Sequence, residues 1–230
     1  MGAVARSQLL PVVCCLLLLP CEAAKAQSPN VHFVDAAQVV PGLALEMRYF
    51  GENNFVGRRI DGYEAPICLL TRQAAAALAN VQRDLAANGL GVKVFDCYRP
   101  VRAVSHFVRW ARDHSDQQKK PEFYPEFDKR DLFRDGYISA RSGHSRGSTI
   151  DVTLITLADQ QQLDMGSPFD FFGARSARLD RSVSAEARTN RNLLAAAMAR
   201  RGFRSYWKEW WHFTLADEPF PDTYFDFPVR

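Results

Sequence analysis

The first segment that could carry out metal chemistry spans residues 142–151 and reads SGHSRGSTID. Its two ligand-type side chains, His144 and Asp151, are seven positions apart, so in one regular strand they would face opposite sides. Gly143 and Gly147 permit a turn between them, which would let the two side chains converge. Asp151 also stands in an otherwise apolar, β-branched run, where a carboxylate is costly unless it is paired or bound to a cation. A metal ion is one way to make this aspartate tolerable.

The second segment, residues 209–212, reads EWWH and supplies what the first lacks. Glu209 and His212 are three positions apart, among tryptophans that could exclude water. Two imidazoles and one carboxylate form a three-ligand set, which is typical of a catalytic zinc site with one position left for water. His144, Asp151 and His212 are therefore the candidate ligands, and Glu209 is the candidate general base.

A plainer interpretation of these residues stays open at this point. A lone buried histidine more often hydrogen-bonds in a core than binds a metal, and an aspartate in a strand can be a satisfied structural group. The spacing also matches none of the known helical zinc motifs. The other histidines, His32, His106 and His114, have no comparable neighbours, and we expect them on the surface or on helix faces.

The elements that must position these residues follow from the hydrophobic pattern. Alternation of apolar and polar residues predicts a strand over residues 43–49. The chain has no internal repeat and no Gly/Ser-rich or Pro-rich linker. We therefore expect an α+β fold, a single domain in which helices pack on a mainly antiparallel sheet. The further expected elements are strands over 92–97 and 149–157, a strand or hairpin over 203–215, and helices beginning at Thr71, Pro100 and Ser184.

Length and composition exclude several classes of protein. The 230 residues are 47% hydrophobic and 24% charged, which is ordinary for a globular domain and excludes collagen-like and disordered chains. The formal net charge is only +3 and the chain has no Lys/Arg block, so nucleic acid is not an expected partner.

The first 26 residues have the pattern of a secretory signal peptide. An apolar stretch runs from Leu9 to Pro20, and the segment Ala24-Lys25-Ala26 offers the small-x-small pattern that signal peptidase cleaves. Cleavage after about Ala26 would leave residues 27–230 as the mature domain, exported to the periplasm without stable membrane insertion. We do not expect a lipid anchor at Cys21, because a proline precedes it where such sites usually have a small residue.

Only Cys68 and Cys97 remain in the mature chain. In an exported protein such a pair could form a disulfide, or both could be buried apolar thiols at strand ends. The oxidising compartment favours the disulfide. A metal site at these cysteines is not expected, because neither has a second Cys or His at short ligand spacing.

The pattern S-x-H-x-x-G-x-x-x-D followed by E-W-W-H resembles the zinc D,D-peptidases of bacterial cell-wall metabolism. More narrowly, the chain resembles the D-alanyl-D-alanine dipeptidases of the vancomycin-resistance type, over roughly Leu43 to Phe213. Thr149 and Ser167 depart from the family's usual residues, and neither is a proposed ligand. The further matching motifs are RY at 48–49, NNFVG at 53–57, DGY at 61–63, DCYRP at 96–100, RAV at 102–104 and MGSPFD at 165–170.

The resemblance implies one zinc ion per chain, with His144, Asp151 and His212 as its ligands and Glu209 as the general base. It also implies the hedgehog/DD-peptidase-like fold for a catalytic domain over residues 27–230. Zinc would polarise the scissile carbonyl and lower the pKa of its water.

Four further roles come from the same resemblance. Arg99, a permanent cation, would stabilise the oxyanion of the tetrahedral intermediate. Tyr49, Ser142 and Asp170 would contact the two ends of a small dipeptide substrate, and Asp170 would pair with its free ammonium. Plainer alternatives are a surface salt bridge for Arg99, a loop cap for Asp170 and a core position for Tyr49.

The expected function is zinc-dependent hydrolysis of the D-alanyl-D-alanine dipeptide in cell-wall peptide metabolism. One rival is a D,D-carboxypeptidase that trims peptidoglycan stem peptides. The other is a non-catalytic, zinc-dependent wall-binding domain, which would most simply lack the base or the oxyanion helper, yet Glu209 and Arg99 are both present. The sequence carries no expectation of an oligomeric state.

Overall fold

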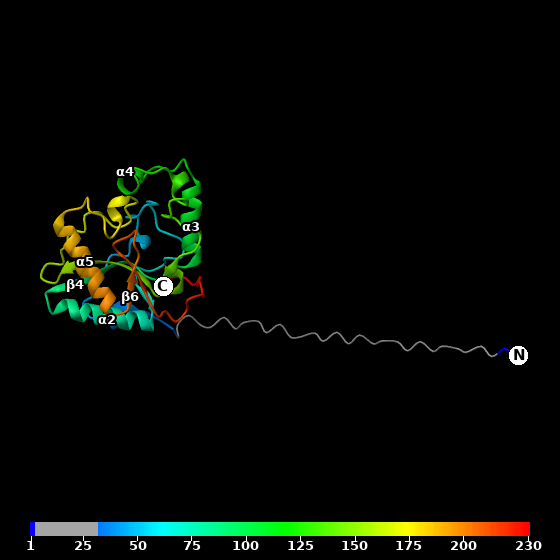
Figure 1. The fold of residues 1–230 in the computed structure, drawn as a ribbon, viewed down its shortest axis with the longest axis horizontal. Coiled ribbons are helices and arrows are strands. Elements are labelled where there is room, and N and C mark those ends of the chain that lie inside the picture. Colours follow the sequence, from blue (N-terminus) through cyan, green and yellow to red (C-terminus); the bar gives the residue numbers. More distant parts are fainter. Residues whose placement is uncertain (3–31) are drawn as a thin grey trace.

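Two sheets carry the fold, and the computed structural model describes residues 1–2 and 32–230. The main sheet has the strand order β2–β4–β5–β7–β6, in which only the pair β2–β4 is parallel. The second sheet pairs β1 with β3. Sheets and helices together confirm the α+β class and its mainly antiparallel sheet (Figure 1). The strands are β1 (Phe33–Asp35), β2 (Ala44–Leu45), β3 (Leu69–Thr71), β4 (Leu90–Asp96), β5 (Thr149–Thr156), β6 (Phe203–Ser205) and β7 (His212–Leu215).

The helices begin where the sequence predicts. The Thr71 hydroxyl accepts a hydrogen bond from the N–H of Ala74, and the Ser184 hydroxyl accepts one from Ala187, so each caps the free first turn of its helix. Pro100 precedes the second predicted helix. The α-helices are α1 (Ala36–Val39), α2 (Arg72–Ala86), α3 (Val101–Arg112), α4 (Lys120–Phe123) and α5 (Ala185–Arg200), and the short 3₁₀ turns are η2 (Arg48–Phe50), η3 (Lys129–Asp131), η4 (Gly143–Arg146) and η5 (Ala174–Ser176).

The expected signal peptide, apart from its first two residues, lies outside the described residues. Within the described part of the chain, no helix is long and apolar enough to cross a membrane.

The two faces of the main sheet differ in chemistry because side chains alternate along β5. Ile150, Val152 and Leu154 are fully buried on one face, where α2 and α5 pack against the sheet. Figure 1 shows these two helices lying together on one side of the molecule, with α3 on the other. Asp151 and Thr153 alternate with the apolar residues and therefore face the side away from α2 and α5. The Asp151 carboxylate therefore lies on the face of the sheet that α2 and α5 leave uncovered, where a site can form.

The strand predicted over residues 43–49 is wrong for its second half. Only Ala44–Leu45 pairs with β4, and the chain then winds into η2. The cause is the loop that follows, because the Asn54 amide donates to three carbonyls of this loop and curls the backbone around itself. The turn buries Tyr49, which is 2% exposed, instead of leaving it on a strand.

Cys68 and Cys97 are joined by a disulfide, and both are fully buried. Cys68 directly precedes β3 and Cys97 directly follows β4, so the bond ties the small sheet to the main sheet across 29 positions of sequence. The backbone N–H of Tyr98 also donates to the carbonyl of Leu69 at 2.9 Å. The segment that leads to Arg99 is therefore fixed at the end of β4.

Candidate metal centre and active site

Three elements bring His144, Asp151 and His212 together. Asp151 on β5 and His212 on β7 are register partners on adjacent strands, so their side chains point to the same face of the sheet. His144 lies in η4, just before β5. The turn back into the strand passes through Gly147, whose φ is +81°. A Cβ there would lie 2.2 Å from the ring of Phe33, so only glycine fits this turn.

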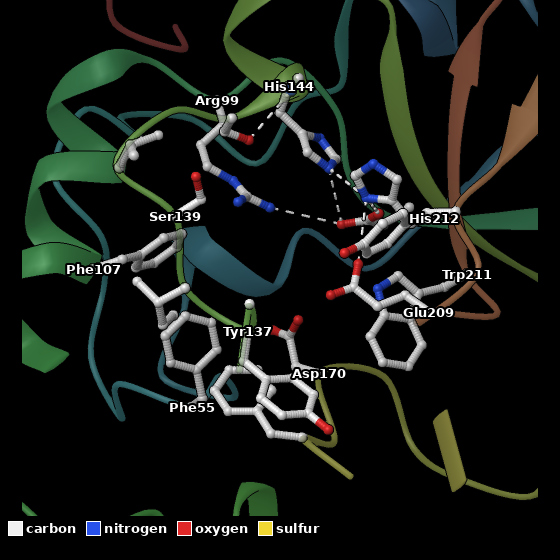
Figure 2. A pocket seen from close by; sticks show the side chains of 18 of the residues that line it. Phe55, Arg99, Phe107, Tyr137, Ser139, His144, Asp170, Glu209, Trp211 and His212 are labelled. Atoms are coloured by element: carbon white, nitrogen blue, oxygen red, sulfur yellow. Dashed lines mark hydrogen bonds and ion pairs between the residues drawn. The ribbon is translucent and has the colours of Figure 1, made fainter. Parts of the chain in front are cut away.

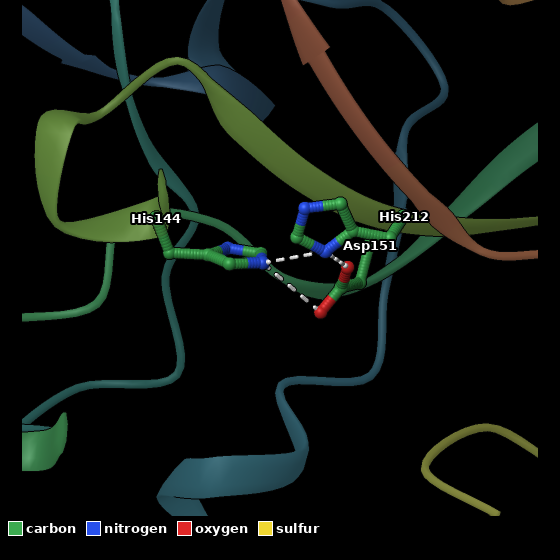
Figure 3. A group of neighbouring side chains, drawn as sticks. All are labelled: His144, Asp151 and His212. Carbon is green, nitrogen blue, oxygen red and sulfur yellow. Dashed lines mark hydrogen bonds and ion pairs between the residues drawn. The ribbon is translucent and has the colours of Figure 1, made fainter. Parts of the chain in front are cut away.

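The ligand-type atoms of these residues face one another at short range (Figure 3). His144 Nε2 lies 3.3 Å from Asp151 Oδ2, and His212 Nδ1 lies 3.1 Å from Asp151 Oδ1. The two imidazole nitrogens are 3.3 Å apart. Among the described residues, this is the group of histidines, cysteines and carboxylates that could hold a metal ion.

The chemistry of this donor set fits a zinc ion. His144 Nδ1 lies 2.7 Å from the carbonyl oxygen of Cys97, and because a carbonyl only accepts, Nδ1 carries the proton and Nε2 keeps its lone pair. Asp151 Oδ1 is buried and receives no hydrogen bond of good geometry, although His212 Nδ1 is near. Burial by itself would raise the pKa of Asp151, but His144 and His212 outweigh it and hold this pKa well below its usual range. Two imidazoles and an ionised carboxylate form a zinc-type set.

Glu209 lies beside the cluster without joining it. Its Oε2 is 3.5 Å from His212 Nδ1, and its side chain is 19% exposed toward the cavity. Burial raises the pKa of Glu209 to about 7, while His212 lowers it in part. A carboxyl group with a pKa near neutrality is suited to accept a proton and to return it.

Arg99 is held rigidly over the same face. Its Nε and Nη2 donate to Asp96 Oδ2 at 3.0 and 2.8 Å, and its guanidinium lies about 5 Å from the rings of Tyr49 and Phe107. Its Nη2 is also 3.7 Å from Asp151 Oδ2. The surface salt bridge considered as an alternative is therefore not what the structure shows, since Arg99 is 13% exposed and points into the site.

A β-bulge places Asp96, which the sequence analysis did not assign a role. Along β4 the register with β5 shifts between Val94 and Asp96, so that Asp96 lies opposite Asp151. Without the extra residue, Asp96 would follow Val94 onto the face covered by helices. Tyr63 donates to the other oxygen of Asp96 at 2.6 Å. The sequence did carry a signal for Asp96, because a carboxylate at the end of an apolar strand is costly unless it is paired, as argued for Asp151.

One cavity of about 320 Å³ collects all the predicted site residues. Figure 2 shows Arg99, His144, His212 and Glu209 around one side of it, and Phe55 and Tyr137 on the other side with Asp170 beside them. The predicted residues that line it are Tyr49, Arg99, Ser142, His144, Asp151, Asp170, Glu209 and His212.

Asp170 and Tyr49 form a buried pair inside this cavity. The Tyr49 hydroxyl donates to Asp170 Oδ2 at 2.9 Å, and Asp170 is 5% exposed. Asp170 also has a φ of +61°, an uncommon conformation for a residue with a side chain. Burial raises the pKa of Asp170 well above its usual value, and the charge of Asp151 adds to this. A cationic group of a ligand would reverse that shift by pairing with the carboxylate.

Ser142 and the loop before it complete the wall. The Ser142 hydroxyl accepts a hydrogen bond from the N–H of His144, so it caps η4 as well as facing the cavity. Tyr137, Ser139 and Tyr206 also line the cavity and were missed. Their residue types and spacing carry no recognisable signal, because a loop reaches the site only through the tertiary fold.

Comparisons with known proteins agree on one family. The sequence profile of a family described as D-ala-D-ala dipeptidase matches residues 29–230. A D-alanyl-D-alanine dipeptidase of Enterococcus faecium is 38% identical over 201 residues, which cover 87% of this chain and 100% of that protein. One of Enterococcus faecalis is 40% identical and one of Streptomyces coelicolor 41% identical, each over 197 residues and 86% of this chain, covering 98% and 96% of those proteins.

A solved structure is similar at a greater distance. It is the vancomycin resistance D,D-pentapeptidase VanY in complex with Zn(II), with a TM-score of 0.40 and 12% identity, covering 69% of this chain and 78% of that chain.

Proposed function

The chain belongs to the D-ala-D-ala dipeptidase family, and we propose that it hydrolyses the D-alanyl-D-alanine dipeptide with one zinc ion held by His144, Asp151 and His212. The observation that carries this proposal is the convergence of three ligand-type atoms on one point, with a carboxylate and a guanidinium beside them in a single cavity. Those two groups are Glu209 and Arg99, and they lie where a base and an oxyanion partner are needed.

A zinc ion bound to the three ligands would polarise the scissile carbonyl and make water a better nucleophile. Glu209 accepts the proton of the attacking water and delivers it to the departing amine, which suits its raised pKa. Arg99 stabilises the negative charge that develops on the carbonyl oxygen. Asp96 holds this guanidinium in place, so little reorganisation is needed during the reaction.

Asp170 and Tyr49 bind the free ammonium of the dipeptide, because their pair offers a buried carboxylate at the cavity wall. Ser142, which lines the same cavity, contacts the opposite end of the substrate. An ammonium site in the wall of the cavity favours a dipeptide over a longer chain, whose amine is acylated at that position.

The experiment that tests the proposal measures D-alanine release by purified protein, with and without a chelator. We expect release from D-alanyl-D-alanine, loss of release with the chelator and recovery with added zinc. Equal or faster cleavage of an N-acylated tripeptide that ends in D-alanyl-D-alanine would favour the D,D-carboxypeptidase. Zinc binding with no hydrolysis of either substrate would favour the wall-binding domain.

We also propose that the protein is exported and that residues 1–26 are removed. The signal-like pattern of that segment supports this, as does the Cys68–Cys97 disulfide, because such bonds persist in oxidising compartments. N-terminal sequencing of periplasmic protein is expected to begin at about residue 27. An intact N-terminus on protein found with the cytosolic fraction would contradict it.

A further inference from the structure

Two strongly exposed apolar residues lie on surface segments that are hydrogen-bonded to each other. Leu179 and Trp207 are each 67% exposed, more than any other large apolar side chain between residues 32 and 230. The backbone N–H of Arg178 donates to the carbonyl of Trp207 at 3.1 Å, which holds their two segments side by side. Scattered exposed apolar residues are normal, but two of the most exposed ones on adjoining segments are a candidate contact surface.

Four cations that lie within four positions of Leu179 or Trp207 in the sequence have no carboxylate partner. Arg175, Arg178, Arg181 and Lys208 each lack a carboxylate oxygen within 4.0 Å among the described residues. Arg178 instead reaches the Asn192 amide oxygen. We name Arg175, Arg178, Leu179, Arg181, Trp207 and Lys208 the cationic aromatic patch.

The positive charge of the patch is only partly offset by neighbouring carboxylates. Asp180, the carboxylate within it, accepts hydrogen bonds from the backbone and the hydroxyl of Ser182. The Lys208 ammonium donates to the carbonyl of Asp135 and lies 5.1 Å from the Trp207 ring. Asp180 and Asp135 offset part of the positive charge, but the four cations outnumber these two carboxylates, so the net charge here is positive. By contrast, Arg201 is neutralised by a two-pronged ion pair with Asp84.

We propose that the cationic aromatic patch docks the protein on an anionic phospholipid surface. Tryptophan is favoured at the level of lipid headgroups, where Leu179 would bury its side chain alongside it. Unpaired arginines and lysines are attracted to the lipid phosphates. A soluble polyanion would account for the cations but not for the two exposed apolar side chains, so the bilayer is the occupant that uses the whole patch.

The test is sedimentation with vesicles of phosphatidylglycerol and of phosphatidylcholine, at low and high salt. We expect binding to the phosphatidylglycerol vesicles alone, weakened by salt. Trp207 gives a second readout, because Trp110, Trp210 and Trp211 are at most 5% exposed. Its fluorescence is expected to shift to shorter wavelength on the vesicles, and Trp207→Phe should remove the shift.

Variants separate the two components of the patch. Arg178→Gln/Arg181→Gln is expected to weaken binding by roughly fivefold per arginine, and Leu179→Ser/Trp207→Ser to weaken it while leaving the charge intact. The matched control Arg59→Gln/Arg112→Gln removes two exposed arginines elsewhere and should change binding less than about twofold. All variants should keep the thermal midpoint of the parent protein.

Three results would overturn the proposal. The first is no binding of correctly folded protein to phosphatidylglycerol vesicles at low salt. The second is binding to soluble polyphosphate that matches binding to vesicles and is unchanged in Leu179→Ser/Trp207→Ser, which would identify a polyanion site. The third is concentration-dependent dimerisation that the same variant abolishes, which would identify a contact between copies of the chain.

Discussion

His144 Nδ1 donates to the backbone carbonyl of Cys97 across 2.7 Å, and the sulfur of Cys97 is bonded to Cys68. The hydrogen bond fixes both the orientation of the imidazole and the nitrogen that carries its proton. The disulfide fixes the backbone that supplies the carbonyl, two residues before Arg99. A covalent link that lies outside the cavity therefore supports both a metal ligand and the oxyanion partner.

Removal of this disulfide is expected to weaken stability and metal binding together. The bond closes a loop of 29 positions, so Cys68→Ala/Cys97→Ala should lose about 3 to 4 kcal/mol of unfolding free energy at most. Zinc affinity should also fall, since the carbonyl that orients His144 is less firmly held. Urea unfolding and a zinc titration measure the two effects. Denatured mature protein that titrates two free thiols would show that the bond is absent.

Glu209→Gln is expected to separate zinc binding from turnover. The substitution keeps the shape of the side chain but removes the base, so kcat should fall by about 10² to 10⁴. Zinc content should stay near that of the parent, because the ligand atoms belong to other residues. His144→Ala is the matched control and should lose the metal. A Glu209→Gln protein that purifies without zinc would make Glu209 a ligand.

Activity is expected to rise with pH through the acidic range. The base works only when it is deprotonated, and burial raises the pKa of Glu209 to about 7 with no metal bound. A bound dication would lower this pKa, so the midpoint of kcat/KM should lie below about 7. Zinc content measured at each pH separates this limb from loss of the metal. A rate that increases as the pH falls from 7 to 5 would contradict the assignment.

Many structural features that depend on residues close together in the sequence were predicted correctly. Features that depend on residues far apart in the sequence could not be predicted from the residue pattern. Thr71 and Ser184 cap their helices as expected, because an N-cap hydrogen bond joins residues three positions apart. The pairing of Asp151 with His212 depends on the register of two strands far apart in sequence. The residue types therefore offered this ligand set as only one of two interpretations, and the family resemblance was needed to favour it. The bulge that turns Asp96 toward the site leaves no mark in the residue pattern.

Asp96 is expected to act as a positioning residue for Arg99. Asp96→Asn keeps one acceptor oxygen but loses the charge that holds the guanidinium, so kcat should fall by about 10- to 100-fold with little change in KM. Asp226→Asn is the control, since Asp226 also pairs with an arginine, Arg102, but on the open surface. Its activity should match the parent. Loss of zinc in Asp96→Asn would show that the residue acts instead through His144, 3.4 Å away.

Asp170 is expected to decide whether the substrate needs a free amine. Asp170→Asn keeps the acceptor for the Tyr49 hydroxyl but removes the charge, and a lost charged hydrogen bond corresponds to about 10- to 150-fold in affinity. KM for D-alanyl-D-alanine should rise by that factor, while the N-acetylated dipeptide, already a poor substrate, should be little affected. Steady-state kinetics on both substrates measure the ratio, with the exposed Asp159→Asn as control. An equal loss on both substrates would mean that Asp170 only maintains the shape of the cavity.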